Sequence, residues 1–151
     1  MEVEKIKDYR NNVITKFNDI DELISLVISA SYLHDYDEDF IANILYDPAV
    51  GFLSKQRMLK QVFKRERIKD NENIISKINN MRKIRNNFVH ATIQISIKEE
   101  GKLKTFSPRN FKKPIDPEKE YKEFIRYFYE VDNFLENCKQ HISRNISNGN
   151  E

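Results

Sequence analysis

The chain has 151 residues, 33% of them charged, and a formal net charge of +2, which fits one globular domain with a single core. Its one cysteine, Cys138, excludes an intramolecular disulfide. The sequence contains no apolar run that resembles a signal peptide or a membrane span, so we expect a cytoplasmic protein without a membrane partner.

The charges divide by sign along the chain. Residues 1–52 hold 4 Lys and Arg against 11 Asp and Glu, residues 53–113 hold 17 against 5, and residues 114–151 hold 5 against 8. The net charges are therefore −7, +12 and −3. The basic middle segment could attract a polyanion such as RNA. Alternatively, acidic and basic segments neutralise one another in the fold.

Only 3 glycines and 4 prolines favour long helices with few breaks. Apolar residues recur at helical spacing over residues 3–33, as one long helix or two. Asp37 or Asp39 is the expected cap of a short helix, which Asp47 and Pro48 end.

Ser54 is the predicted N-cap of a helix over residues 55–68, and its solvated face is heavily basic. A further helix begins at Asn71 or Asn73. Clustered cations suit phosphate contacts, so we expect the basic helix at residues 55–69 to bind RNA, with an ordinary solvated face as the alternative. The expected RNA-binding residues are Arg57, Lys60, Lys64, Arg82 and Lys83.

A small β-hairpin is predicted over about residues 92–106, because polar and apolar residues alternate there around a turn. Residues 107–117 contain three prolines and are expected to form a loop that could touch RNA. A last long helix begins at Asp116 and Pro117, and residues 145–151 are expected to be a disordered tail. The predicted fold is an all-α helical bundle of residues 1–144 with this hairpin before the last helix.

The stretch MRKIRNNFVHA, residues 81–91, places Arg85 and His90 near the end of a helix. Arginine can hold a phosphate through a planar fork of donors, and histidine can transfer protons near neutral pH. On an ideal helix Arg85 falls about 20° from the apolar direction, whereas His90 lies about 140° from Arg85. A guanidinium in an apolar stripe needs a carboxylate, a carbonyl cluster, a subunit interface or an anionic ligand.

Two arrangements would let both side chains act on one phosphate. The helix could unwind near residues 89–92, or two copies could meet so that their motifs share one cleft. In the alternative without catalysis, Arg85 pairs with an acidic residue of the first helix and His90 only caps a helix C-terminus.

The segment RNNFVH, which follows INNMRKI, resembles the R-x(4–6)-H signature of HEPN domains, including the polar residue after the arginine. This resemblance implies a HEPN-like helical bundle and a metal-independent endoribonuclease that uses no cofactor. It further implies a homodimer with a composite cleft, in a toxin–antitoxin or antiphage setting with an antitoxin or regulatory protein as possible partner. His90 would act on the 2′-hydroxyl or the leaving oxygen, Arg85 would stabilise the phosphate charge, and Asn86 would orient them.

A second resemblance gives the alternative function. HEPN toxins paired with a nucleotidyltransferase tend to carry R-x(4–6)-H-x-Y, whereas Ala91 and Thr92 follow His90 here. The layout LYDPAVGFLSKQRMLKQVF, followed by RKIRNNFVH, is also similar to the mannitol operon repressor branch. That similarity implies a non-catalytic module that regulates or binds a protein.

Other candidate residues receive structural interpretations. His34 lies among acidic residues, but the spacing matches no metal-binding loop, so we expect a solvated helix entrance and no metal. Cys138 continues an apolar stripe and is expected to be a buried thiol, and His141 is expected at the surface. Aromatic residues of the last helix are assigned to packing rather than to base stacking: Tyr121, Tyr127, Phe128 and Tyr129.

Overall fold

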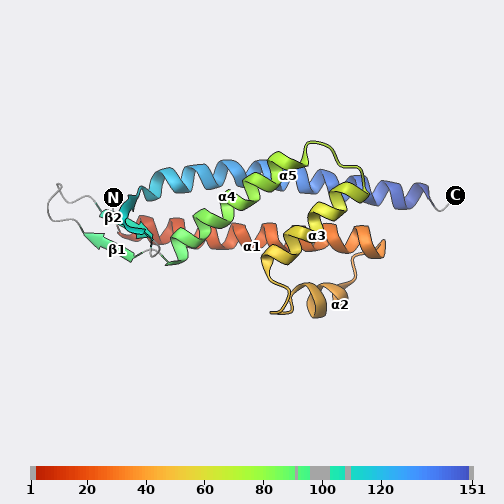
Figure 1. Cartoon of the computed structure of the whole chain (residues 1–151), viewed down its shortest axis with the longest axis horizontal. Helices are drawn as coiled ribbons and strands as arrows, with labels where there is room; N and C mark the ends of the chain where they lie inside the picture. Colours follow the sequence, from red (N-terminus) through yellow and green to blue (C-terminus); the bar gives the residue numbers. More distant parts are fainter. Residues whose placement is uncertain (1–2, 91, 96–102, 108–109, 150–151) are drawn as a thin grey trace. The chain divides into compact units, whose positions relative to one another are not determined.

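The computed structural model describes residues 3–90, 92–95, 103–107 and 110–149, with side chains for 3–90 and 115–149. Helices make up most of this part of the chain, in agreement with the predicted all-α class (Figure 1). Contacts divide the chain into two compact units, which are described separately. Unit 1 is Met1–Asn18 with Ile78–Tyr129, and unit 2 is Asp19–Lys77 with Glu130–Glu151. The expected single domain of residues 1–144 stays a prediction.

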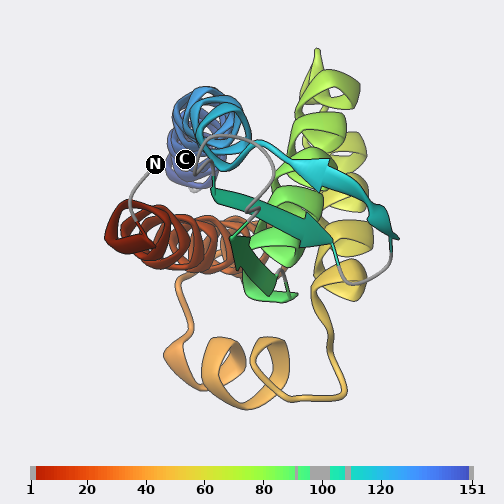
Figure 2. The ribbon, with the colours of Figure 1, turned by 90° about the vertical axis from the view of Figure 1, so that its left-hand side faces the viewer.

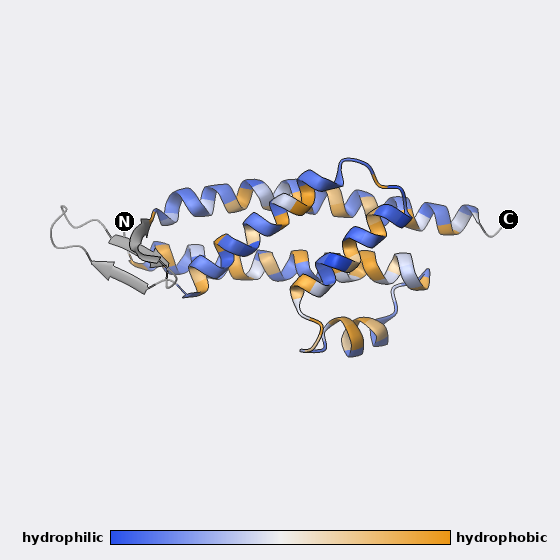
Figure 3. Ribbon diagram, viewed as in Figure 1, coloured by the Kyte–Doolittle hydropathy of each residue, from blue (hydrophilic) through white to orange (hydrophobic). Residues whose placement is uncertain are grey.

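Three long helices contribute segments to both units. They are α1 (Val3–Leu33), α4 (Asn71–His90) and α5 (Pro117–Asn148). The first helix is thus one helix and not two. Each presents apolar residues at intervals of three and four, which places them on one face. Figure 3 shows the resulting alternation of hydrophobic and hydrophilic positions along α5.

The core of unit 1 forms from the facing stripes of its three helix segments. Its buried side chains are Ile6, Val13 and Phe17 of α1, Ile78, Met81, Ile84 and Phe88 of α4, and Phe124 and Phe128 of α5. Tyr9 and Tyr121 stack beside this core with their ring centroids 4.1 Å apart. Burying so many large apolar side chains stabilises the unit, at about 1.5–3 kcal/mol for each one fully buried.

Three short strands connect α4 to α5 within unit 1 (Figure 2). β1 (Thr92–Ile95) pairs antiparallel with β2 (Leu103–Ser107), and β2 pairs antiparallel with β3 (Asn110–Ile115). The expected turn between β1 and β2 lies outside the described residues. The prediction of a loop over residues 107–117 is wrong for β3, which contains only one of the three prolines and pairs with β2 through backbone hydrogen bonds.

Helix boundaries in unit 2 follow local hydrogen bonding. Asp37 caps α2 (Glu38–Phe40), since its Oδ1 accepts a hydrogen bond from the Phe40 backbone at 2.8 Å, and the helix continues as η1 (Ile41–Leu45). The predicted cap at Ser54 is wrong. α3 (Phe52–Arg65) begins after Gly51, whose carbonyl accepts from the backbone N–H groups of Ser54 and Lys55.

The last helix begins as predicted and ends later. The Asp116 Oδ1 accepts hydrogen bonds from the backbone of Glu118 at 3.0 Å and of Lys119 at 3.2 Å. The expected disordered tail is wrong for residues 145–148, which belong to α5. The physical reason is the apolar stripe, which continues through Ile142, only 1% exposed, to the half-buried Ile146.

Candidate active site

Arg85 occupies the apolar side of α4 in unit 1, as its position in the sequence predicts. The side chain is half-buried, and its Cζ lies 5.1 Å from the centre of the Phe17 ring. Its Nη1 donates a hydrogen bond of 2.9 Å to the Asn86 Oδ1. The expected alternative of a carboxylate on the first helix is wrong for the described residues, among which Arg85 forms no ion pair. A guanidinium held only by an amide and a ring retains donors for an anionic ligand.

Asn87 and Glu120 form a second polar contact beside this helix. The Asn87 Nδ2 donates to the Glu120 Oε2 at 3.2 Å. Burial raises the pKa of the Glu120 carboxyl above its ordinary value, and the hydrogen bond from Asn87 offsets part of that rise. This contact ties α4 to the start of α5 next to the motif.

His90 is the last residue of α4, and its side chain is exposed. Its ring forms no hydrogen bond with any side chain or backbone group in the described ranges, so both nitrogens are accessible to a ligand.

Arg10 is a residue of this site that sequence analysis missed. Its Nη2 donates to the Val89 carbonyl at 3.2 Å, which brings a second guanidinium to the end of α4. A signal was present in the sequence, because Arg10 falls at helical spacing between Ile6 and Val13 in the apolar stripe of α1. In the structure Arg10 is exposed, whereas Arg85 is half-buried.

The helix between Arg85 and His90 is unbroken. α4 continues through His90, and β1 begins only at Thr92, so the expected unwinding near residues 89–92 does not separate the two residues. Five residues of regular helix turn the side chains about 140° apart and advance them about 7.5 Å along the axis. A single copy therefore presents the two groups in different directions.

The predicted RNA-binding residues occupy both units. Arg57, Lys60 and Lys64 are exposed on α3 in unit 2. In unit 1, Lys83 is exposed, and the half-buried Arg82 has an Nε with no hydrogen-bond partner among the described residues.

Lys55, at the start of the basic helix, does not belong to a solvated surface. It is only 3% exposed, and its ammonium lies 2.8 Å from the Asp21 carboxylate. The same ammonium lies 4.1 Å from the centre of the Tyr46 ring. Lys55 is therefore not available to bind a nucleic acid, because Asp21 already compensates the charge of its ammonium inside the unit.

The other candidate residues from the sequence are described by their burial and packing. Cys138 is buried, and burial raises the pKa of its thiol to about 11, which opposes nucleophilic reactivity. His141 is exposed, as predicted. Phe128 is buried, whereas Tyr129 is 61% exposed and packs its ring edge-on against Phe128, with the centroids 5.4 Å apart. Within the described part, no three His, Cys, Asp or Glu side chains are grouped to hold a metal ion.

The half-buried Glu120 carboxyl predicts that the stability of the protein depends on pH. Because its pKa is raised in the folded state, the native protein binds this proton more tightly than the unfolded chain, and the contribution of Glu120 to stability falls as the pH rises through its titration. We expect Glu120→Gln to raise the free energy of unfolding at pH 7 and to leave it nearly unchanged near pH 3. Urea denaturation at the two pH values measures this, and an equal change at both would contradict the explanation.

Comparison of the chain with protein families, curated proteins and solved structures finds no match. Among the helices of the described residues, none has an apolar stretch long enough to cross a bilayer.

Proposed function

We propose that this protein is a HEPN-like, metal-independent endoribonuclease that acts as a homodimer. The observation that carries the proposal is the half-buried Arg85, which no carboxylate among the described residues neutralises and which Asn86 holds at 2.9 Å. A guanidinium fixed in this way can bind an anion through its remaining donors, and the phosphate of RNA is such an anion.

The chemistry assigns one role to each residue of the motif. His90 takes the proton of the 2′-hydroxyl or delivers one to the leaving 5′-oxygen. Arg85 stabilises the negative charge that develops on the phosphate, and Asn86 orients the guanidinium. The products would be a 2′,3′-cyclic phosphate and a 5′-hydroxyl, and DNA would remain intact because it lacks the attacking group.

The proposal includes a dimer because α4 is unbroken between the two residues. Arg85 and His90 of one copy point about 140° apart, whereas two copies related by a twofold axis could supply one residue each to a shared cleft. In this proposal β1 and β2 form the hairpin inserted into the HEPN-like bundle, and the protein serves as a toxin or an antiphage component.

Cleavage without metal tests the proposed activity. The purified protein should cut a labelled mixed-sequence RNA in EDTA and leave cyclic phosphate ends, while DNA of the same sequence stays intact. Intact RNA at high enzyme concentration, with a correctly folded protein, would contradict the proposal.

Exposed cations of α3 are expected to add affinity for RNA. Lys60→Glu with Lys64→Glu should weaken binding and lower the slope of log affinity against log salt by about 1.4, since each phosphate contact on a single strand contributes about 0.7. Fluorescence anisotropy at several salt concentrations measures both quantities. An unchanged slope would exclude α3 from the RNA interface.

A non-catalytic regulatory or protein-binding module is the second candidate. The observation in its favour is the same unbroken helix, because one copy of the chain does not direct Arg85 and His90 to a single atom. In that case substitution of His90 would leave the chemistry of added RNA unchanged.

A further inference from the structure

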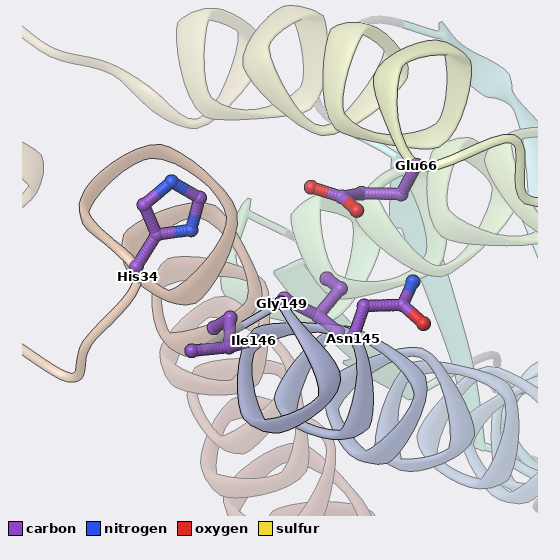
Figure 4. A pocket seen from close by; sticks show the side chains of 6 residues that line it. His34, Glu66, Asn145, Ile146 and Gly149 are labelled. Carbon is purple, nitrogen blue, oxygen red and sulfur yellow. The ribbon is translucent and has the colours of Figure 1, made fainter. Parts of the chain in front are cut away.

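A pocket in unit 2 lies at the carboxyl ends of three helices. Its volume is about 420 Å³, within the range of small-molecule sites, and it is lined by His34, Glu66, Ile142, Asn145, Ile146 and Gly149. α1 ends immediately before His34, α3 ends immediately before Glu66, and α5 ends at Asn148. Figure 4 shows the Glu66 carboxylate extending toward the side on which His34 lies.

Glu66 supplies the pocket with a fixed negative charge. Its Oε1 accepts a hydrogen bond of 2.6 Å from the hydroxyl of Ser31, which is fully buried. Glu66 itself is half-buried, and no described Lys, Arg or His forms an ion pair with it. The neighbouring Arg65 instead places its guanidinium 5.4 Å from the centre of the Tyr32 ring. A partly desolvated carboxylate with a neutral partner is stabilised by a cation.

The carboxyl ends of α1, α3 and α5 add to the negative charge that Glu66 brings to the pocket. The backbone enters the left-handed region at His34, with φ 57°, and at Arg67, with φ 55°, so α1 and α3 terminate sharply beside the pocket. The carboxyl end of each helix carries the negative end of its dipole, and at α3 the Phe63 and Lys64 carbonyls accept hydrogen bonds from the backbone of Ile68 and Arg67. Three such ends together with a carboxylate favour a positively charged ligand.

The remaining walls determine the shape of that ligand. Ile142 is 1% exposed and Ile146 is half-buried, so α5 provides an aliphatic wall. Asn145 also lines the pocket, and its amide nitrogen lies 3.2 Å from the His141 Nε2. A carboxylate beside an aliphatic wall matches an ammonium group on a short carbon chain.

We propose that this pocket binds a small aliphatic amine. The ammonium group hydrogen-bonds to Glu66, and the carbon chain lies against Ile142 and Ile146. The proposal is independent of the ribonuclease activity, because every residue that carries it belongs to unit 2.

The test is a titration of the full chain with 1,4-diaminobutane at low salt, followed by amide NMR shifts and calorimetry. We expect saturable shifts at Glu66, Asn145 and Gly149, and none with 1,4-butanediol, which has nearly the same shape without charge. Glu66→Gln keeps the size of the side chain and an acceptor for Ser31, and it should weaken binding at least tenfold. Glu72→Gln, which removes an exposed carboxylate outside the pocket, should bind as the wild type does.

Three results would overturn the proposal. They are saturable binding of the diol with similar affinity, unchanged affinity in Glu66→Gln, or no shift in the wild type at 10 mM diamine, a concentration at which even a roughly millimolar site would be mostly filled. The comparison of diamine with diol uses the wild type alone, so it tests the need for a positive charge on the ligand even if a variant folds poorly.

Discussion

Replacing His90 by alanine is expected to lower the rate of RNA cleavage by about 10²–10⁴-fold, the usual contribution of general acid–base catalysis. The side chain is exposed at the end of α4, so its removal should leave the thermal midpoint nearly unchanged. Single-turnover cleavage in EDTA measures the rate. His141→Ala is the matched control, because it removes another exposed histidine from a helix and should cleave as the wild type does.

Mixing two inactive variants tests whether the same site is shared between copies. If Arg85 comes from one copy and His90 from the other, a heterodimer of Arg85→Ala with His90→Ala retains one intact site of two. Random exchange of subunits should then restore about a quarter of the wild-type activity, because about half of the dimers are heterodimers. No recovery after subunit exchange would refute the composite cleft, and a stable monomer at high concentration would do the same.

Replacing Asp21 by asparagine is expected to destabilise the protein by about 3 kcal/mol, the low end for breaking a buried pair, since Asp21 is itself partly exposed. The substitution leaves the ammonium of Lys55, only 3% exposed, without its carboxylate at 2.8 Å. Urea denaturation should show the loss, together with a fall in thermal midpoint of about 10 °C.

Two controls separate this effect from the loss of any ion pair. Glu136→Gln breaks the more exposed pair with Lys139 and should cost less than about 1 kcal/mol. Adding Lys55→Met to Asp21→Asn removes the stranded charge and should recover much of the stability. If Asp21→Asn and Glu136→Gln destabilise equally, the buried pair has no special role.

Several features of the site were predictable from the sequence. Helical spacing places Arg85 in the apolar stripe of α4, and the structure has it half-buried against Phe17. The helix starts at Asp37 and Asp116 depend on a side-chain oxygen and the backbone of the next turn, which are local interactions. The buried Cys138 follows from the same periodicity.

Other features depend on contacts between residues far apart in the sequence. Arg10 reaches the carbonyl of Val89, 79 positions away, and no local pattern specifies that partner. Lysine is normally a surface residue. Lys55 can be buried because Asp21 of α1 lies beside its ammonium and compensates the charge. The strand β3 needs β2 as a partner, so its proline-containing sequence alone indicated a loop.

The sequence by itself therefore determined the helical class, most helix starts and the buried faces, because these follow from side-chain period and local capping. The sequence also identified Arg85, Asn86 and His90 as the candidate site residues. The tertiary structure alone decided that α4 runs unbroken through His90, that Arg10 joins its end, and that a carboxylate lines a pocket at three helix ends. Those outcomes depend on packing between distant segments, which no single stretch of sequence encodes.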